Sequence, residues 1–245
     1  MNKITWNIEE FESLSSTNNA LRENAELFTE GKVYIARTQS AGKGSKGRTF
    51  ISAHGGLYLS LLLKPKTKGF SATGITALTA VAMSDAIEEV FGLSVGIKWV
   101  NDLIYKKKKV GGILVEGKAD SNEFSWVIVG VGVNIITPTG GFDEEIKHVA
   151  GSLVDNASEQ DRQRLISVFL DKFNEYYSNF DKGLYKSKYK SKSVVLGKIV
   201  TVNTNNGAIT GVASDIDSEN RLVVKNACEE YVFSSGEVVK VDYER

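Results

Sequence analysis

Short apolar runs rich in β-branched and aromatic residues constrain the fold of this chain more than any other sequence feature. Each run is bounded by glycine or charged residues, a pattern typical of β-strands. Between the second and third runs, apolar side chains recur at helical spacing from Ile75 to Val90 and stop before Gly92, which predicts a helix. A second helical stripe covers residues 158–180, and a shorter helix is expected to begin near Thr17. The expected strands are Tyr34–Thr38, Leu57–Leu63, Val95–Trp99, Gly112–Glu116 and Phe124–Asn134. This mixture predicts an α+β fold built around a sheet.

The pattern changes after residue 183. Gly183–Ser193 is polar and repetitive, and helical periodicity disappears beyond it. Short alternating runs separated by turn sequences follow, and they suit a small β-barrel of about fifty residues. These runs are Lys198–Val202, Ile209–Val212, Arg221–Lys225, Tyr231–Phe233 and Val238–Tyr243. We therefore expect two domains, residues 1–190 and 194–245.

Composition excludes several classes of protein. The 30 basic and 30 acidic side chains leave no net charge, which argues against a general binder of nucleic acid or membrane surfaces. With 42% hydrophobic residues the chain can bury a core, so disorder is not expected as its main state. Cys228, His54 and His148 provide neither an internal disulfide nor a cluster of metal ligands. A cytoplasmic protein without a leader or membrane span is expected, since the apolar stretch Trp126–Ile136 is too short to cross a bilayer.

Two glycine motifs resemble familiar phosphate sites without their structural context. Residues 42–47 match G-x-G-x-x-G, but no convincing helix begins after Arg48 to supply the phosphate-binding N-terminus. Residues 112–119 resemble a P-loop but lack its final serine or threonine, and Ile113–Val115 suit a buried strand. What remains at residues 42–48 is a cationic, glycine-rich loop. It can close over phosphates, and an ordinary solvated turn is the alternative.

Five short segments, taken together and in order, resemble the catalytic domain of biotin protein ligases. They are Ser16–Asn18, Gln39–Gly42, Lys98–Asp102, Lys109–Glu116 and Gly130–Asn134. The resemblance covers residues 14–136, and the small terminal β-domain is similar to the SH3-like module of that family. It implies a mixed-sheet catalytic domain of the biotin/lipoate ligase type followed by an SH3-like β-barrel.

The resemblance also implies a two-step reaction. Biotin and ATP, with Mg²⁺, would give biotinyl-5′-AMP, and a lysine of a biotin carboxyl carrier protein domain, part of a biotin-dependent carboxylase, would then accept the biotinyl group. No protein nucleophile is needed, which agrees with the lack of a Gly-x-Ser-x-Gly motif. Bringing a carboxylate against a triphosphate requires cations and N–H donors nearby.

The implied catalytic residues are Lys109, Arg48 and Asp102. Lys109 would reach the biotin carboxylate and the α-phosphate, and only it stands three residues before Gly112 as the motif requires. The alternative is one more solvated lysine in the run 106–109. Asp102 would lie near the acceptor amine and help to remove its proton, whereas an Asn-Asp turn is the simpler interpretation.

Further residues are implied in substrate binding. Those assigned to biotin are Ser16, Thr17, Gln39, Gly42, Lys109, Gly112, Gly130 and Gly132. Those assigned to the nucleotide are Lys43, Gly44, Ser45, Lys46, Arg48, Asn101 and Asn134. No residue is assigned to a protein-bound metal. A helix N-cap remains the alternative for Ser16 and Thr17, and bulges or tight strand crossings remain the alternative for the glycines.

The loop departs from the family pattern, in which arginines occupy the positions of Lys43 and Ser45. Lysine lacks the bidentate fork of arginine, and serine lacks its charge. We therefore expect this loop to hold the adenylate less tightly than an arginine-rich loop would. Val100 stands at the position of a family proline, which affects turn rigidity more than chemistry.

Other functions remain open at this point. Ser16 lies so near Met1 that no N-terminal DNA-binding domain is expected, so a monofunctional ligase without a nucleic-acid partner is predicted. The alternatives are a lipoate-protein ligase or octanoyl transferase of the same fold, and a non-catalytic biotin-binding sensor. The sequence does not decide between a monomer and a homodimer.

Overall fold

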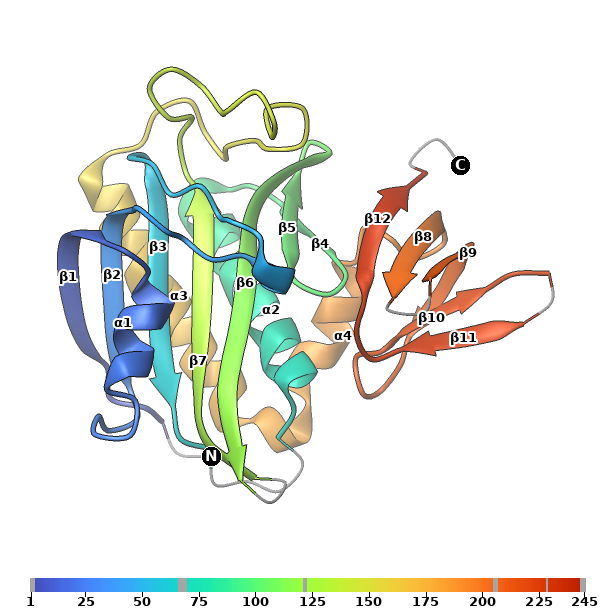
Figure 1. Cartoon of the computed structure of the whole chain (residues 1–245), viewed down its shortest axis with the longest axis horizontal. Coiled ribbons are helices and arrows are strands. Elements are labelled where there is room, and N and C mark those ends of the chain that lie inside the picture. Colours follow the sequence, from blue (N-terminus) through green and yellow to red (C-terminus); the bar gives the residue numbers. More distant parts are fainter. Residues whose placement is uncertain (1–2, 66–69, 121–122, 205–206, 228, 243–245) are drawn as a thin grey trace.

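A computed structural model describes residues 3–65, 70–120, 123–204, 207–227 and 229–242, which form a seven-stranded sheet followed by a five-stranded sheet (Figure 1). The first sheet has the order β1-β2-β3-β7-β6-β5-β4. Its strands are β1 Asn7–Leu14, β2 Lys32–Gln39, β3 Gly56–Leu63, β4 Gly96–Lys98, β5 Asp102–Tyr105, β6 Lys108–Asp120 and β7 Glu123–Asn134. Only the β1–β2 pair is parallel, so the expected mixed sheet is confirmed.

Helices cover both faces of this sheet, as Figure 1 shows. Helices α2 (Ala72–Phe91) and α3 (Glu159–Ser178) pack together on one face, and the short α1 (Thr17–Glu23) lies on the other. The predicted end is confirmed, because Gly92 ends α2 in the left-handed conformation at φ 68°, and Ser71 caps its start. Since strand β3 lies between these layers, every one of its residues is buried.

All five strands predicted for the first sheet are present, but β1 and β5 were not predicted. Strand β1 is an exposed edge strand that carries three glutamates, so it lacks the apolar run that identifies a buried strand. Strand β5 begins at Asp102, within the segment interpreted as a turn, and has only four residues. Its side chains Leu103 and Ile104 are buried between β4 and β6.

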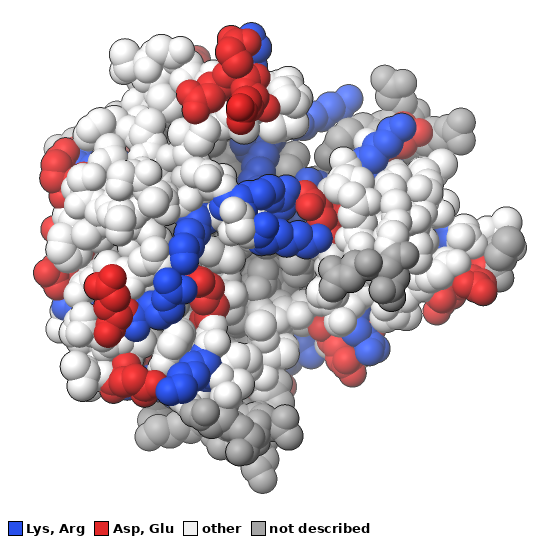
Figure 2. Space-filling model, viewed as in Figure 1, with Lys and Arg blue, Asp and Glu red and all other residues white. Residues whose placement is uncertain are grey.

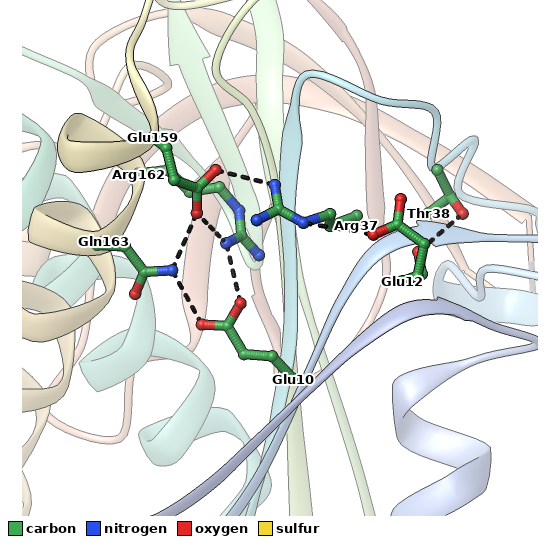
Figure 3. Close-up of polar contacts among 7 residues, drawn as sticks. All are labelled: Glu10, Glu12, Arg37, Thr38, Glu159, Arg162 and Gln163. Atoms are coloured by element: carbon green, nitrogen blue, oxygen red, sulfur yellow. Dashed lines mark hydrogen bonds and ion pairs between the residues drawn. The ribbon is translucent and has the colours of Figure 1, made fainter.

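An ion-pair network attaches the edge strand β1 to helix α3 (Figure 3). The guanidinium of Arg37, on β2, bonds to Glu159 at 2.8 Å and lies 3.6 Å from Glu12 of β1. Arg162 lies 3.3 Å from Glu10 of β1 and 3.1 Å from Glu159. The Arg37 guanidinium holds the pKa of Glu159 at about 2. This network fixes the strand whose end leads directly into α1.

The polar segment at residues 183–193, where the sequence analysis expects the boundary between domains, contains a helix that was not predicted. It follows a 3₁₀ turn, Phe180–Lys182, and forms α4 (Leu184–Ser191). Tyr185 and Tyr189 lie one helical turn apart and are both buried, so the repeated Lys-Ser-Tyr pattern encodes a helix with one apolar face.

The C-terminal residues form an antiparallel sheet in the order β11-β10-β9-β8-β12. Its strands are β8 Ile199–Thr204, β9 Gly207–Ile216, β10 Leu222–Lys225, β11 Glu230–Phe233 and β12 Glu237–Val241. All five predicted runs form strands. Tyr243, the predicted end of the last strand, lies outside the described residues, as does Cys228. The indole N–H of Trp99 donates to the Asn220 carbonyl at 3.0 Å and joins this sheet to the first. No helix among the described residues is long and apolar enough to cross a membrane.

Candidate active site

A cavity of 420 Å³ lies against the α1 face of the larger sheet, and glycines form its floor. Gly112 of β6 and Gly132 of β7 are cross-strand partners, and Gly130 follows on the same face. A Cβ atom at Gly130 would collide with Asn18 Oδ1, and one at Gly132 would lie 2.6 Å from the Phe50 ring. The close approach of α1 and of residue 50 to the sheet therefore requires glycine at both positions.

At one wall of the cavity, Ser16, Thr17 and Gln39 are held by hydrogen bonds, two of them to serines that lie outside the lining. The backbone N–H of Thr17 donates to Gln39 Oε1 at 2.8 Å, and the Gln39 amide donates to Ser52 Oγ at 2.8 Å. The Ser60 hydroxyl lies 2.7 Å from Thr17 Oγ1. Ser16 caps α1 by accepting from the backbone of Asn19, so the predicted N-cap role and a place in the cavity wall coexist.

A buried carboxylate positions two lysines at the opposite wall. Asp102 Oδ1 lies 2.5 Å from Lys109 Nζ, and Oδ2 lies 3.1 Å from Lys98 Nζ. Burial alone would raise the pKa of Asp102, but the two ammonium groups, Lys109 first, hold its pKa below the ordinary value. The side chain of Asp102 is 13% exposed and that of Lys109 is 37% exposed. This arrangement holds the Lys109 side chain over Gly112, where an added Cβ would meet its Nζ at 3.5 Å.

The glycine-rich loop closes on itself and then contacts the small sheet. Backbone bonds from Phe50 N to Gly42 O (2.8 Å) and from Gly44 N to Arg48 O (2.7 Å) form a narrow loop with a 3₁₀ turn, Ser45–Gly47, at its tip. No α-helix follows it in the described part of this segment, in agreement with the rejection of a dinucleotide-binding motif. At 2.5 Å, Arg48 Nη1 forms an ion pair with Glu237, the first residue of β12.

The segment after β7 covers the end of the cavity beside Lys109. The backbone N–H of Lys109 donates to Val149 O at 2.8 Å, and Gly151 N–H donates back to Lys109 O at 2.9 Å. Asn134 donates to Gly151 O at 3.1 Å and holds the same segment. Phe142 and Ile146 add apolar surface to the cavity wall.

The fold brings nearly all predicted site residues to this one cavity. Those that line it are Ser16, Thr17, Gln39, Lys43, Gly44, Ser45, Arg48, Asn101, Asp102, Lys109, Gly112, Gly130, Gly132 and Asn134. Gly42 does not line it. A Cβ at this position would collide with Phe50 O, so glycine is needed there for the loop to close. Lys46 points instead toward a neighbouring groove, with its Nζ 3.9 Å from Glu237.

Several residues that reach the cavity from distant elements were not predicted from the sequence. Asn18, Phe142, Ile146 and Glu237 all line it. Asn18 carried a signal, because it follows two predicted site residues at the start of a helix. Ser60 does not line the cavity but bonds to Thr17, and it carried a signal as the one polar residue in the predicted strand Leu57–Leu63 besides Tyr58. Glu237 carried no signal, because nothing in the sequence indicates that the small sheet touches the loop.

Cations gather at the hollow between the two sheets (Figure 2). Those lining the cavity are Lys43, Arg48, Lys98 and Lys109. Among the described residues no group of three or more histidine, cysteine or acidic side chains is placed to hold a metal ion. The site is therefore built to receive an anion, and its described residues offer no protein cage for a divalent cation.

Residues 10–134 match a family model described as the biotin/lipoate A/B protein ligase family, which covers just over half of the 245 residues. The chain belongs to this family. A second model, the biotin protein ligase C-terminal domain, matches residues 195–241 of this family member. The expected fold class, a biotin/lipoate ligase-type catalytic domain with a C-terminal SH3-like domain, is thereby confirmed.

Named relatives extend the similarity along most of this ligase-family chain. It is 34% identical over 218 residues to the bifunctional ligase/repressor BirA of Bacillus subtilis, covering 86% of this chain and 67% of that protein. It is 30% identical over 220 residues to the biotin–[acetyl-CoA-carboxylase] ligase of Mycobacterium tuberculosis, covering 86% and 79%. A solved biotin protein ligase from Aquifex aeolicus, in complex with biotin and ATP, matches with 26% identity and a TM-score of 0.77 over 94% of this chain and 97% of that one.

Proposed function

We propose that this protein is an ATP-dependent biotin protein ligase that forms biotinyl-5′-AMP and transfers the biotinyl group to a lysine of a carrier protein. The observation that carries the proposal is Lys109, held by Asp102 over a glycine floor, between a row of neutral polar groups and a basic loop. The match of residues 195–241 to the biotin protein ligase C-terminal domain favours biotin over lipoate as the substrate.

The polar wall suits the ureido ring of biotin. That ring has two N–H donors and one carbonyl acceptor, so its pocket needs both acceptors and donors. Ser16, Thr17 and Gln39 supply hydroxyl and amide groups of both kinds at one end of the cavity. The glycine floor leaves room for the valeryl chain between this wall and Lys109.

In the first step, a carboxylate oxygen of biotin attacks the α-phosphorus of ATP, the bond from that phosphorus to the bridging oxygen breaks, and pyrophosphate leaves with the electron pair. Lys109 and Arg48 neutralise the charge that accumulates where two anions meet. Lys43 and the backbone of the loop bind the phosphates. Asp102 keeps Lys109 in position through their ion pair.

In the second step, the acceptor amine attacks the biotinyl carbonyl carbon, a C–N amide bond forms, and the bond from that carbon to the phosphate oxygen breaks. A lysine ammonium and biotinyl-AMP thus give the amide, AMP and two protons. We assign to Asp102 the hydrogen bond from the entering amine, and its pairing with two ammonium groups in this site supports that assignment.

Several finer predictions belong to this proposal. Mg²⁺ would enter with the nucleotide phosphates, because the described residues offer no metal cluster, and no step here depends on it. The carrier would be the biotin carboxyl carrier domain of a carboxylase, and the two domains would be residues 1–190 and 194–245. A cytoplasmic location and the absence of a nucleic-acid partner remain predictions from the sequence. The sequence does not choose between a monomer and a homodimer.

Incubation with ATP, Mg²⁺, biotin and a purified carrier domain, followed by intact-mass analysis, tests the proposal. Wild type should add one biotinyl group to the carrier, and Lys109→Ala should not. A parallel incubation with lipoate tests the runner-up, a lipoate-protein ligase or octanoyl transferase. Addition of lipoate alone would replace biotin by lipoate in the proposal. Biotin binding without ATP–pyrophosphate exchange would indicate a non-catalytic sensor.

A further inference from the structure

A second groove, of 250 Å³, opens beside the main cavity between the two sheets. Its outer part is formed by Ala72, Thr73 and Thr76 at the start of α2 and by the turn Ser234–Gly236 of the small sheet. Its inner part includes Asp102, which also lines the main cavity. The groove is therefore a second way to the same carboxylate, separate from the floor on which biotin and the nucleotide are proposed to lie.

Glu237 stands at the partition between the groove and the main cavity and lines both. Its carboxylate pairs with Arg48 at 2.5 Å and with Lys46 at 3.9 Å, and its side chain is 28% exposed. The nucleotide-binding cations of one domain are thus held by a carboxylate of the other. In this arrangement the Glu237 carboxylate is the anion that the cations of the loop bind.

The charges of the groove change when a phosphate competes with Glu237. Without a nucleotide, Lys46, Arg48 and Lys98 outnumber Asp102 and Glu237 by one among the described lining residues, so the groove repels another ammonium group. A nucleoside triphosphate carries several negative charges against the one of Glu237, so it draws Arg48, and with it the loop that carries Lys46, away from this carboxylate. Glu237 then loses both of its ion-pair partners, and its carboxylate attracts a cation into the groove.

We propose that the acceptor lysine enters through this groove and that Glu237, released by Arg48 when phosphates bind, receives its ammonium group. This inference rests on the proposed ligase function and adds a route and an order to it. The carrier lysine is attracted only after the nucleotide has been loaded. Before attack at the biotinyl carbonyl, the ammonium loses one proton to water by way of Asp102, and amide formation releases the second. Glu237 acts by binding and positioning the acceptor.

Glu237→Gln separates this role from a structural one, because the two half-reactions should change in opposite directions. In biotin-dependent ATP–pyrophosphate exchange, KM for ATP should fall about threefold, since no carboxylate competes for Arg48. In transfer from purified biotinyl-AMP, KM for the carrier domain should rise about tenfold, with a smaller change in kcat. Glu237→Asp keeps the charge and should restore most of the carrier affinity. Glu230→Gln is the matched control, because Glu230 is an exposed acid of the same sheet that pairs with Lys225.

Thr73→Trp tests the route independently of Glu237, because it fills the outer groove. Transfer to the carrier should fall at least about tenfold relative to transfer to hydroxylamine, a nucleophile small enough to enter without the groove. Equal losses with both acceptors, or an unchanged KM for the carrier in Glu237→Gln, would overturn the inference. If wild type catalysed neither half-reaction, the ligase proposal itself would fail, and this inference with it.

Discussion

At the scale of single residues, the pairing of Asp102 with Lys109 and Lys98 is the contact on which the proposed chemistry most depends. Replacing its carboxylate by a neutral amide would leave two ammonium groups close together without a counter-charge. Asp102→Asn should therefore lower kcat/KM for biotinyl transfer about 100-fold, the usual scale for loss of a positioned acid–base group. Single-turnover transfer from biotinyl-AMP measures this. Asp171→Asn, at an exposed position on α3, is the control, and equal rates in the two variants would contradict the assignment of Asp102.

A second prediction at this scale concerns Ser45. It lines the cavity at a position where the family resemblance implies an arginine, so we expect the loop to have one cation fewer for the adenylate. Ser45→Arg should slow release of biotinyl-AMP about tenfold, because a charge-assisted bond to phosphate is gained. Rapid filtration of radiolabelled biotinyl-AMP measures the release. An unchanged release rate would show that retention does not depend on the loop charge.

The sequence was sufficient to identify residues whose motif spacing has a chemical meaning. Lys109 differs from Lys106, Lys107 and Lys108 only by its distance from Gly112, and it alone of the four lines the cavity. Glu237 could not be found in this way. Its role depends on the packing of β12 against a loop that lies in the first quarter of the chain, and no local pattern encodes such a contact.

At the scale of elements, the glycine floor couples α1, β6 and β7. A Cβ at residue 130 would collide with the buried Asn18, whose amide bonds to Glu116 at 2.8 Å and therefore cannot move freely. Gly130→Ala should lower the free energy of unfolding by about 1–3 kcal/mol. Urea denaturation measures the change. Gly112→Ala is the matched control, because its Cβ meets only ordinary contacts at 3.5 Å with the flexible Lys109, and equal losses would contradict the packing argument.

Elements were predictable wherever one face is buried and the other is not. Helix α3 shows this, since its apolar stripe and its capping box at Ser158 agree on where it begins. Strand β1 could not be predicted, because its stability comes from pairing with β2 and from ion pairs to α3 rather than from its own side chains. Helix α4 was missed because two buried tyrosines among lysines and serines give a weak apolar stripe.

At the scale of the whole molecule, Asp85 connects the central helix α2 to α4, the helix that leads into the small sheet. This buried carboxylate accepts from the Tyr176 hydroxyl at 2.6 Å and pairs with Lys188 at 2.7 Å and Lys192 at 3.3 Å. Burial would raise the pKa of Asp85, but the bonds to Lys188 and Tyr176 outweigh it and hold the pKa below the ordinary value. The connection between the two parts of the molecule is therefore weakened by acid.

Asp85→Asn tests that connection. At pH 7 the variant should lose about 2 kcal/mol of unfolding free energy, because charged hydrogen bonds are lost in a buried place. A carboxyl whose pKa is lowered by folding stabilises the protein above its unfolded pKa of about 3.9 and ceases to do so as pH falls through the folded value. The difference between wild type and variant should therefore shrink below about pH 4. Urea denaturation across this range measures it, and a difference that stayed constant with pH would mean that Asp85 stabilises the protein by its shape and not by its charge.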